Sequence, residues 1–375
     1  MVTIFNIRPK GFNVGNDAIY MGMQFYLYQA FGEIPNIITL PATSYYETHN
    51  KAGLTAQTIY EINQYGHGVI VGGGNLYENG KFQVDVDALK SLEVPLMLFS
   101  LSHGRIYNRL DRLVERTDAL PTKIISALNE KADYSLVRDE ATCEYLRRIG
   151  CENIRVSGCP SVFLDRTDYR LPELPERDKG GVLISVRNPQ LMSIPLHKQR
   201  RVSSDIMGIV KFLRSRRHAD IRLLCHDHRD IAFAATIPGI DYVYTGDVYS
   251  YLSMLRKCSL NVSYRLHSAL PCLAYDTPFI KISYDERANS LLKTIGYDDW
   301  NIKMFETENI LEQVEDRYRR LGELTDFKQR AKSKLKALDH IIAETFEKFA
   351  RDVCAYKATT DEIERIDEQT YSRHC

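Results

Sequence analysis

Short apolar runs alternate with longer stretches of helical periodicity along most of this chain. Helical spacing is clear in residues 17–31, where apolar residues stand at positions 19, 23, 26, 27 and 30. This alternation is typical of parallel α/β layers, in which each buried strand is followed by a helix that crosses back over the sheet. In the first half of the chain the pattern predicts strands at residues 2–7, 37–40, 68–71, 96–100, 134–137 and 154–156.

The alternation breaks at residues 171–181, which hold two prolines, two glycines and five charged residues, as interdomain linkers do. It then restarts, with strands predicted at 182–186, 221–225, 260–262 and 279–283. The sequence therefore predicts an α/β protein with two Rossmann-like domains facing across a cleft, one over residues 1–172 and one over 173–306. We expect residues 307–375 to form helices that pack back, with a long helix at 327–355 and a polar tail.

Composition excludes several classes of protein. The 375 residues carry 49 Lys+Arg and 49 Asp+Glu, and a nucleic-acid specialist usually has a basic excess. Apolar runs are far shorter than the ~20 residues of a membrane span. The eight cysteines form no C-x-x-C pair, and residues 1–10 read as a strand rather than a secretory signal. We expect a reduced, cytoplasmic protein.

Polar and glycine residues follow the predicted strands of the first half, and ligands of open α/β sheets bind beyond those strand ends. A turn from Gly11 to Asp17 leads into a helix, and three consecutive glycines precede Asn75. Glycines permit close backbone approach to a ligand, although a tight turn or a helix cap explains the same residues. The candidate ligand-binding residues here are Asn13, Asp17, Gly73, Gly74, Asn75 and His103.

Cations follow the predicted strands of the second half. Arg187 ends the strand at 182–186, Arg265 and His267 follow the strand at 260–262, and Arg287 follows the strand at 279–283. Arginine forks match carboxylate and phosphate groups bidentately. Three arginines and a histidine at equivalent ends of one sheet predict a site for a small polyanion.

Metal binding has weaker support. His226 and His228 would share one side of a strand, which suits a metal, but no third ligand stands nearby. Asp85 and Asp87 match a short acidic motif that arises readily by chance. We expect no metal, and the roles of His226 and His228 stay open.

These motifs together resemble the polysaccharide pyruvyl transferase family. The resemblance spans roughly residues 10 to 297, and its most specific part is Arg265-Leu266-His267 combined with Ser283-Tyr284-Asp285. The glycine motifs, Arg138-Asp139-Glu140 and Arg187 support it. The chain differs at Arg287, where the family usually has lysine, and at Cys159, where the family tends to have an acidic residue.

The resemblance implies a fold similar to the GT-B glycosyltransferases, with phosphoenolpyruvate as donor and a pair of sugar hydroxyls as acceptor. It implies no cofactor. Residues 1–172 would bind the acceptor and residues 173–306 the donor. The predicted acceptor-binding residues are Asn13, Asp17, Gly73, Gly74, Asn75 and His103. By resemblance, Arg187, Arg265, Leu266, His267 and Arg287 fall at donor-binding positions, with His267 as the acid/base. The product would be a pyruvate ketal in a cell-surface polysaccharide such as a capsule or exopolysaccharide.

Two other functions fit the sequence. The first is a GT-B glycosyltransferase that uses a nucleotide sugar, and the second is a carbohydrate-binding or scaffold protein without catalysis. The acceptor sugar, its hydroxyl pair, the ketal configuration and the oligomeric state are not readable.

A local excess of positive charge suggests a membrane partner. Residues 197–222 hold eight Lys+Arg and two Asp, although such a run also suits a solvated helix face. We expect this segment to attract a lipid-diphosphate-linked acceptor or the anionic inner face of the cell membrane, which would place the protein peripherally there.

Overall fold

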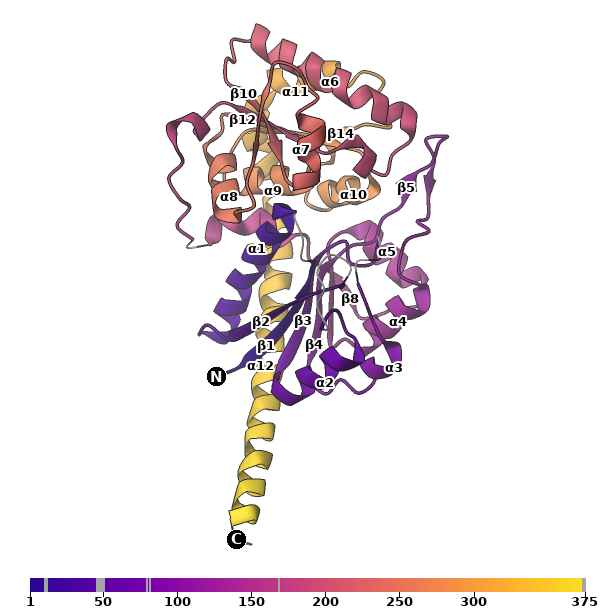
Figure 1. The fold of residues 1–375 in the computed structure, drawn as a ribbon, viewed down its shortest axis with the longest axis vertical. Helices are drawn as coiled ribbons and strands as arrows, with labels where there is room; N and C mark the ends of the chain where they lie inside the picture. Colours follow the sequence, from indigo (N-terminus) through magenta and orange to yellow (C-terminus); the bar gives the residue numbers. More distant parts are fainter. Residues whose placement is uncertain (10–12, 45–50, 79, 81, 168, 373–375) are drawn as a thin grey trace.

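The computed structural model describes residues 1–9, 13–44, 51–78, 80, 82–167 and 169–372. Two parallel sheets of six strands each, both flanked by helices, dominate the fold (Figure 1). The expected pair of Rossmann-like layers is confirmed. Gly11, at the start of the predicted N-terminal turn, lies outside the described residues.

The first sheet has the strand order β2-β1-β3-β4-β7-β8. Its central strands are buried along their whole length, as expected of a sheet covered by helices on both faces. The strands are β1 (Thr3–Arg8), β2 (Asn36–Pro41), β3 (Gly68–Gly74), β4 (Leu96–Leu101), β7 (Tyr134–Val137) and β8 (Ile154–Val156). The helices that follow them are α1 (Val14–Phe31), α2 (Ala56–Tyr65), α3 (Val86–Leu89), α4 (Thr122–Lys131) and α5 (Glu140–Arg148).

The second sheet has the order β11-β10-β9-β12-β13-β14. In chain order this is 3-2-1-4-5-6, the Rossmann arrangement, and its switch point lies between β9 and β12. The strands are β9 (Val182–Val186), β10 (Ile221–Cys225), β11 (Asp241–Tyr244), β12 (Leu260–Ser263), β13 (Phe279–Ser283) and β14 (Ile302–Lys303). The helices are α6 (Leu196–Ser215), α7 (His228–Ala234), α8 (Val248–Lys257), α9 (Leu266–Ala274), α10 (Glu286–Thr294) and α11 (Ile310–Arg319).

The last helix, α12 (Leu324–Ser372), begins beside the second sheet and runs back along the first (Figure 1). Phe327 at its start contacts Trp300, and Phe346 further along contacts Phe99 of β4 edge to face. Helix α12 therefore ties the two sheets together. The sequence predicted a helix at 327–355 with a polar tail, whereas the helix continues to Ser372, because no glycine or proline interrupts residues 356–372.

A hairpin bridges the two sheets on one side. Its strands, β5 (Ile106–Tyr107) and β6 (Leu113–Val114), belong to the first half of the chain. Tyr107 stacks on Phe305 beyond the second sheet, with ring centroids 3.6 Å apart. Arg105 at its base forms an ion pair with Glu286 of α10.

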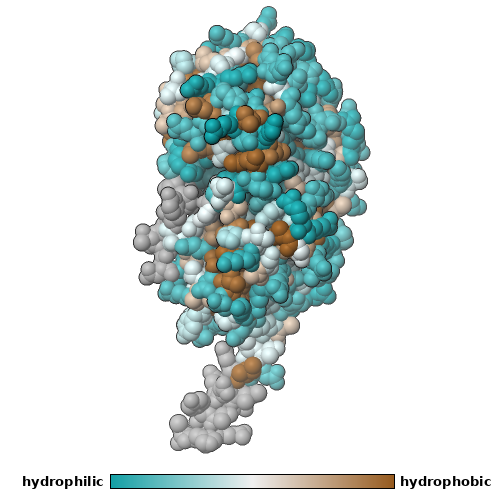
Figure 2. All heavy atoms as spheres, turned by 90° about the vertical axis from the view of Figure 1, so that its right-hand side faces the viewer, coloured by the Kyte–Doolittle hydropathy of each residue, from teal (hydrophilic) through white to brown (hydrophobic). Residues whose placement is uncertain are grey.

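Across the described residues, no helix is both long and apolar enough to cross a bilayer. On the face shown in Figure 2, hydrophilic residues predominate and apolar residues form separate small patches.

Candidate anion-binding site between the two sheets

A cavity of about 300 Å³, called the arginine pocket below, lies between the carboxyl ends of the two sheets. One wall of the pocket is formed by residues that directly follow β9, β10, β12 and β13. The pocket therefore includes the switch point of the second sheet. Its N-terminal wall includes the start of α1 and the end of β3. Six arginines line it: Arg116, Arg138, Arg187, Arg229, Arg265 and Arg287.

Arg265 is the N-cap residue of α9 and carries the least compensated charge in the arginine pocket. The Ser263 hydroxyl accepts a hydrogen bond from the Arg265 N–H at 3.0 Å and donates one to the Arg265 carbonyl at 2.6 Å, which fixes the turn. The Arg265 residue is 8% exposed. Its guanidinium forms no hydrogen bond or ion pair with any described residue. A buried guanidinium without a partner is costly, so this geometry suits an anionic ligand.

Arg187 and Arg138 have weak protein partners. Arg187 Nη1 lies 3.5 Å from Asp227 and 3.3 Å from Asp230, and burial lowers its pKa. Asp227 forms shorter hydrogen bonds with Arg229. Arg138 Nε is buried without a hydrogen bond among the described residues and lies 3.7 Å from Asp139. Both guanidiniums therefore retain capacity to bind an anion.

Arg287 is held by carboxylates instead. It donates to Glu78 Oε2 at 2.7 Å across the domain junction and to Asp285 Oδ2 at 2.5 Å. Glu78 is fully buried, and burial raises its pKa. Arg116 lies 3.7 Å from the same carboxylate and pairs with Asp118 at 2.7 Å. This side of the pocket is thus largely neutralised.

His267 stands in the first turn of α9, where its backbone departs from helical geometry (φ −79°, ψ 24°). Its Nε2 is buried with no hydrogen-bond partner among the described residues. Burial lowers its pKa well below the usual value, and Arg138, Arg265 and Arg287 lower it further. Both effects favour the neutral imidazole.

Two neighbours fix the position of His267. The Tyr251 hydroxyl donates to the His267 carbonyl at 2.7 Å and also lies 2.7 Å from His226 Nε2. From the other domain, Gly15 packs so closely that a Cβ there would lie 2.9 Å from His267 Cβ. The start of α1 therefore packs directly against His267, and only glycine fits at position 15 without a shift.

Three of the six predicted acceptor residues line the arginine pocket, namely Asn13, Gly74 and Asn75. The Asn13 side chain also caps α1 by accepting from the Gly15 N–H at 3.1 Å. Gly74 has φ +101°, a conformation that favours glycine.

Asp17, Gly73 and His103 are not among the lining residues. Asp17 forms an ion pair with Arg8. Gly73 packs against α1, where a Cβ would lie 2.7 Å from Ile19 Cγ2. His103 stacks on Tyr145 with ring centroids 3.8 Å apart, and burial lowers its pKa to about 4.

Sequence reasoning missed part of the arginine pocket. Arg138 directly follows β7 and shares the strand-end position of the other arginines, but its neighbour Asp139 gives the same segment the pattern of a helix start, and Asp139 does cap α5. Arg116 lies in an irregular segment that has no periodic signal. The sequence predicts that His226 and His228 share one side of a strand, but β10 ends at Cys225 and α7 begins at His228, so they do not. No cluster of metal ligands occurs in the part of the chain that the structure describes.

The fold and the pocket define a two-domain protein of GT-B-like architecture with a candidate anion-binding site between its domains. Similar solved structures include the UDP-GlcNAc 2-epimerase of Methanocaldococcus jannaschii (TM-score 0.54, 10% identity, 85% of this chain and 92% of that chain). The Neisseria meningitidis UDP-GlcNAc 2-epimerase has a TM-score of 0.54 at 9% identity, with 92% and 100% of the chains covered. At these identities the likeness shows the fold alone.

The sequence pattern of the polysaccharide pyruvyl transferases matches residues 13–286, and the chain belongs to this family. A search of curated protein sequences gave no significant match. Family membership indicates a transferase of polysaccharide biosynthesis.

Proposed function

We propose that this protein transfers the enolpyruvyl group of phosphoenolpyruvate to two hydroxyls of a sugar, forming a pyruvate ketal. The observation that carries the proposal is the buried guanidinium of Arg265, which has no partner among the described residues. It lies beside the imidazole of His267 in a chain of the pyruvyl transferase family. Phosphoenolpyruvate carries about three negative charges at neutral pH and would supply the missing partner.

The donor would lie against Arg265, Arg187 and Arg138. Arginine forks bind carboxylate and phosphate without help from a metal, and a partly buried site strengthens each contact. Leu266 lines the same pocket and would contact the apolar methylene carbon. Arg287, committed to Glu78 and Asp285, would border the donor rather than carry most of its charge.

His267 would act as the acid/base. Arg138 and Arg265 keep its pKa low in the free protein, and the donor's negative charge opposes their effect, so binding raises that pKa. The protonated imidazole then gives its proton to the methylene carbon, and C2 becomes electrophilic. The first sugar hydroxyl adds to C2, phosphate leaves, and the second hydroxyl closes the ketal. One hydroxyl proton restores His267, and the other leaves with phosphate.

The acceptor would enter from the first sheet, where Asn13, Asn75 and the Gly74 backbone line the pocket. Amide groups and exposed backbone suit hydrogen bonds to sugar hydroxyls. Three exposed cations, Arg214 in the last turn of α6 and Arg216 and Arg217 directly after it, are called the α6 cations below. They would attract a lipid-diphosphate-linked acceptor or an anionic cytoplasmic membrane face.

The second candidate is a glycosyltransferase that uses a nucleotide sugar. Its support is the GT-B-like fold, and the M. jannaschii and N. meningitidis epimerases are described with bound UDP-GlcNAc. Mass spectrometry of sugar acceptors incubated with phosphoenolpyruvate separates the two candidates. We expect a pyruvate ketal product together with released phosphate, and loss of both in His267→Ala. Sugar transfer from a nucleotide sugar, with no reaction of phosphoenolpyruvate, would overturn the proposal.

A further inference from the structure

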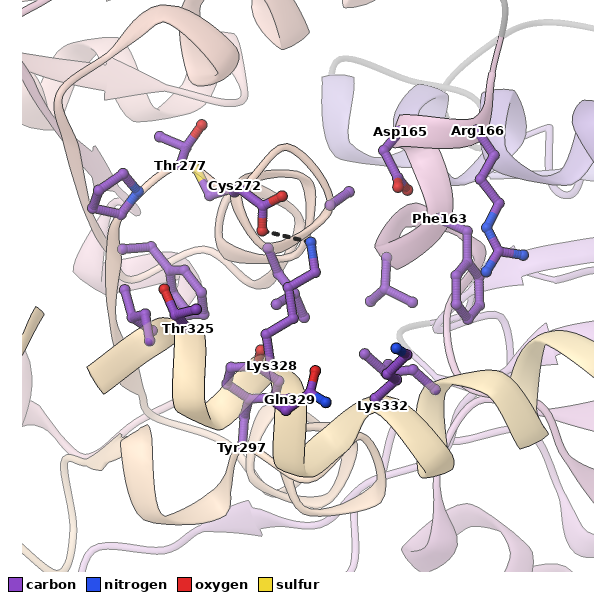
Figure 3. A pocket seen from close by; sticks show the side chains of 18 of the residues that line it. Phe163, Asp165, Arg166, Cys272, Thr277, Tyr297, Thr325, Lys328, Gln329 and Lys332 are labelled. Atoms are coloured by element: carbon purple, nitrogen blue, oxygen red, sulfur yellow. Dashed lines mark hydrogen bonds and ion pairs between the residues drawn. The ribbon is translucent and has the colours of Figure 1, made fainter. Parts of the chain in front are cut away.

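A second and larger cavity, of about 780 Å³, lies at the opposite end of α9 from the arginine pocket. We call it the α12 cavity. Its walls are the short helix η1 (Pro160–Arg166), the end of α9 with the loop to β13, and the first turns of α12 (Figure 3). Leu266 and His267 at the start of α9 line the arginine pocket, whereas Cys272 and Leu273 near its end line the α12 cavity. The two cavities are therefore separate.

The walls of the α12 cavity are largely apolar. Phe163 comes from η1, Leu273 from α9, Phe279 from β13 and Leu335 from α12. The volume falls in the range of ~300–1,000 Å³ that is typical of small-molecule sites. A cavity of this size and character suits an apolar chain.

The rim of the α12 cavity is cationic on the α12 side. Lys328, Lys332 and Lys336 are spaced four residues apart, so they project from one face of the helix. Lys328 forms an ion pair with Asp276. Figure 3 shows the Lys328 side chain extending from α12, with a dashed line at its amine. Lys332 and Lys336 are exposed, and neither forms an ion pair with a described residue.

The carboxylates in the lining are fewer than the amines and arginines. Asp276 forms an ion pair with Lys328, and Asp339 forms one with Arg166. Asp165 is the remaining one, and burial raises its pKa. The rim thus offers two uncommitted amines next to an apolar interior.

We propose that the α12 cavity binds a single-chain lipid phosphate. The phosphate dianion lies between Lys332 and Lys336, and the chain runs inward past Phe163 and Leu273. A phosphate fits better than a carboxylate because two amines match a double charge. This site is independent of the chemistry proposed for the arginine pocket, so either proposal can fail without the other.

The chain contains one tryptophan, which reports on this cavity. Trp300 is fully buried, and its Nε1 donates to the carbonyl of Phe279, a wall residue, at 2.8 Å. The probe is decyl phosphate below its micelle concentration, added to the full-length protein while Trp300 emission is recorded. We expect a saturable change, a weaker response to decanol, none to inorganic phosphate, and an affinity that falls with added salt.

Charge reversal tests the rim. Lys332→Glu combined with Lys336→Glu should weaken decyl phosphate binding about tenfold or more. The matched control reverses Lys123 and Arg351, which are exposed and lie outside the cavity, and should bind as the wild type does. Circular dichroism checks that both proteins are folded.

Competition tests whether the site is separate from the arginine pocket. Arg265→Ala should keep full decyl phosphate affinity, and excess phosphoenolpyruvate should not displace the probe. No saturable change in the wild type, equal binding by the rim variant and its control, or displacement by phosphoenolpyruvate would each overturn the proposal.

Discussion

Arg265 and Arg287 line the same cavity, but only Arg287 is paired with carboxylates of the protein. Arg265 follows β12 and has no carboxylate partner among the described residues, whereas Arg287 follows β13 and binds both Glu78 and Asp285. Arg287 also links the two halves of the chain, because Glu78 belongs to the first half. The difference supports the proposal that Arg265 is kept for a ligand, while Arg287 joins the two halves of the chain.

This contrast matters because the two charges have the same sequence signal. Both arginines follow predicted strands of one sheet, and nothing in their local sequence separates them apart from Asp285. Whether a buried cation pairs with a carboxylate of the protein or remains available to a ligand depends on residues far away in the chain. The predictions below test this division, beginning with the largest expected effect.

Arg287→Ala should destabilise the protein most. It leaves Glu78 and Asp285 buried without their partner, and breaking a buried ion pair costs about 3–5 kcal/mol. Urea denaturation should show this loss in the free energy of unfolding. Adding Glu78→Gln and Asp285→Asn should restore part of it, because the amide at 285 can still cap α10. A loss below about 1 kcal/mol would place Arg287 with the ligand-binding cations.

Arg265→Ala should have the reverse effect: a small change in stability and a large loss of activity. The free energy of unfolding should change by less than about 1 kcal/mol, because no protein partner is lost. Phosphate release from phosphoenolpyruvate should fall about 10²–10³-fold, which is typical when a charge-stabilising donor is removed. Equal turnover in the variant and the wild type would remove Arg265 from the donor site.

His267 and His103 should respond differently to the donor. His267 should gain a proton when phosphoenolpyruvate binds, so its pKa should rise, while His103, outside the pocket, should stay near its value of about 4. Nitrogen-15 NMR of the histidine rings across a pH titration measures both. Because the acid form of His267 is the active one, kcat should fall as pH rises through the pKa of the complex. An unchanged His267 pKa would contradict its role.

The smallest effect is expected at the surface. Reversing the α6 cations by Arg214→Glu, Arg216→Glu and Arg217→Glu should weaken binding to anionic liposomes by up to about 1 kcal/mol per charge. Activity on a soluble acceptor should be retained.

The matched control for α6 reverses three exposed cations of the first half of the chain, at Arg109, Arg112 and Lys123. Liposome cosedimentation compares the two proteins. Equal binding by both would assign the α6 cations to solvation alone.

Much of the fold could be predicted because buried strands have a strong local signal. The predicted strands 134–137, 154–156 and 279–283 have the bounds of β7, β8 and β13. The missed strands β11, β14, β5 and β6 are edge or hairpin strands of two to four residues, several of them partly exposed, so their apolar pattern is weak.

The site could be predicted only in part, for a different reason. Strand-end position correctly placed Arg187, Arg265, His267 and Arg287 along one cavity. Position did not show that Glu78 would reach Arg287, because that pair is 209 residues apart in the chain. In the same way, Asp17 has the sequence environment of a ligand-binding residue, but it is paired with Arg8.

Titration calorimetry of phosphoenolpyruvate into the wild type and into Arg265→Ala tests the central claim most directly. We predict that the wild type binds phosphoenolpyruvate at one site and that Arg265→Ala, folded and with unchanged stability, loses measurable binding. Equal affinity in the two proteins, or binding of UDP-GlcNAc in place of phosphoenolpyruvate by the wild type, would contradict the claim that Arg265 is kept for the donor.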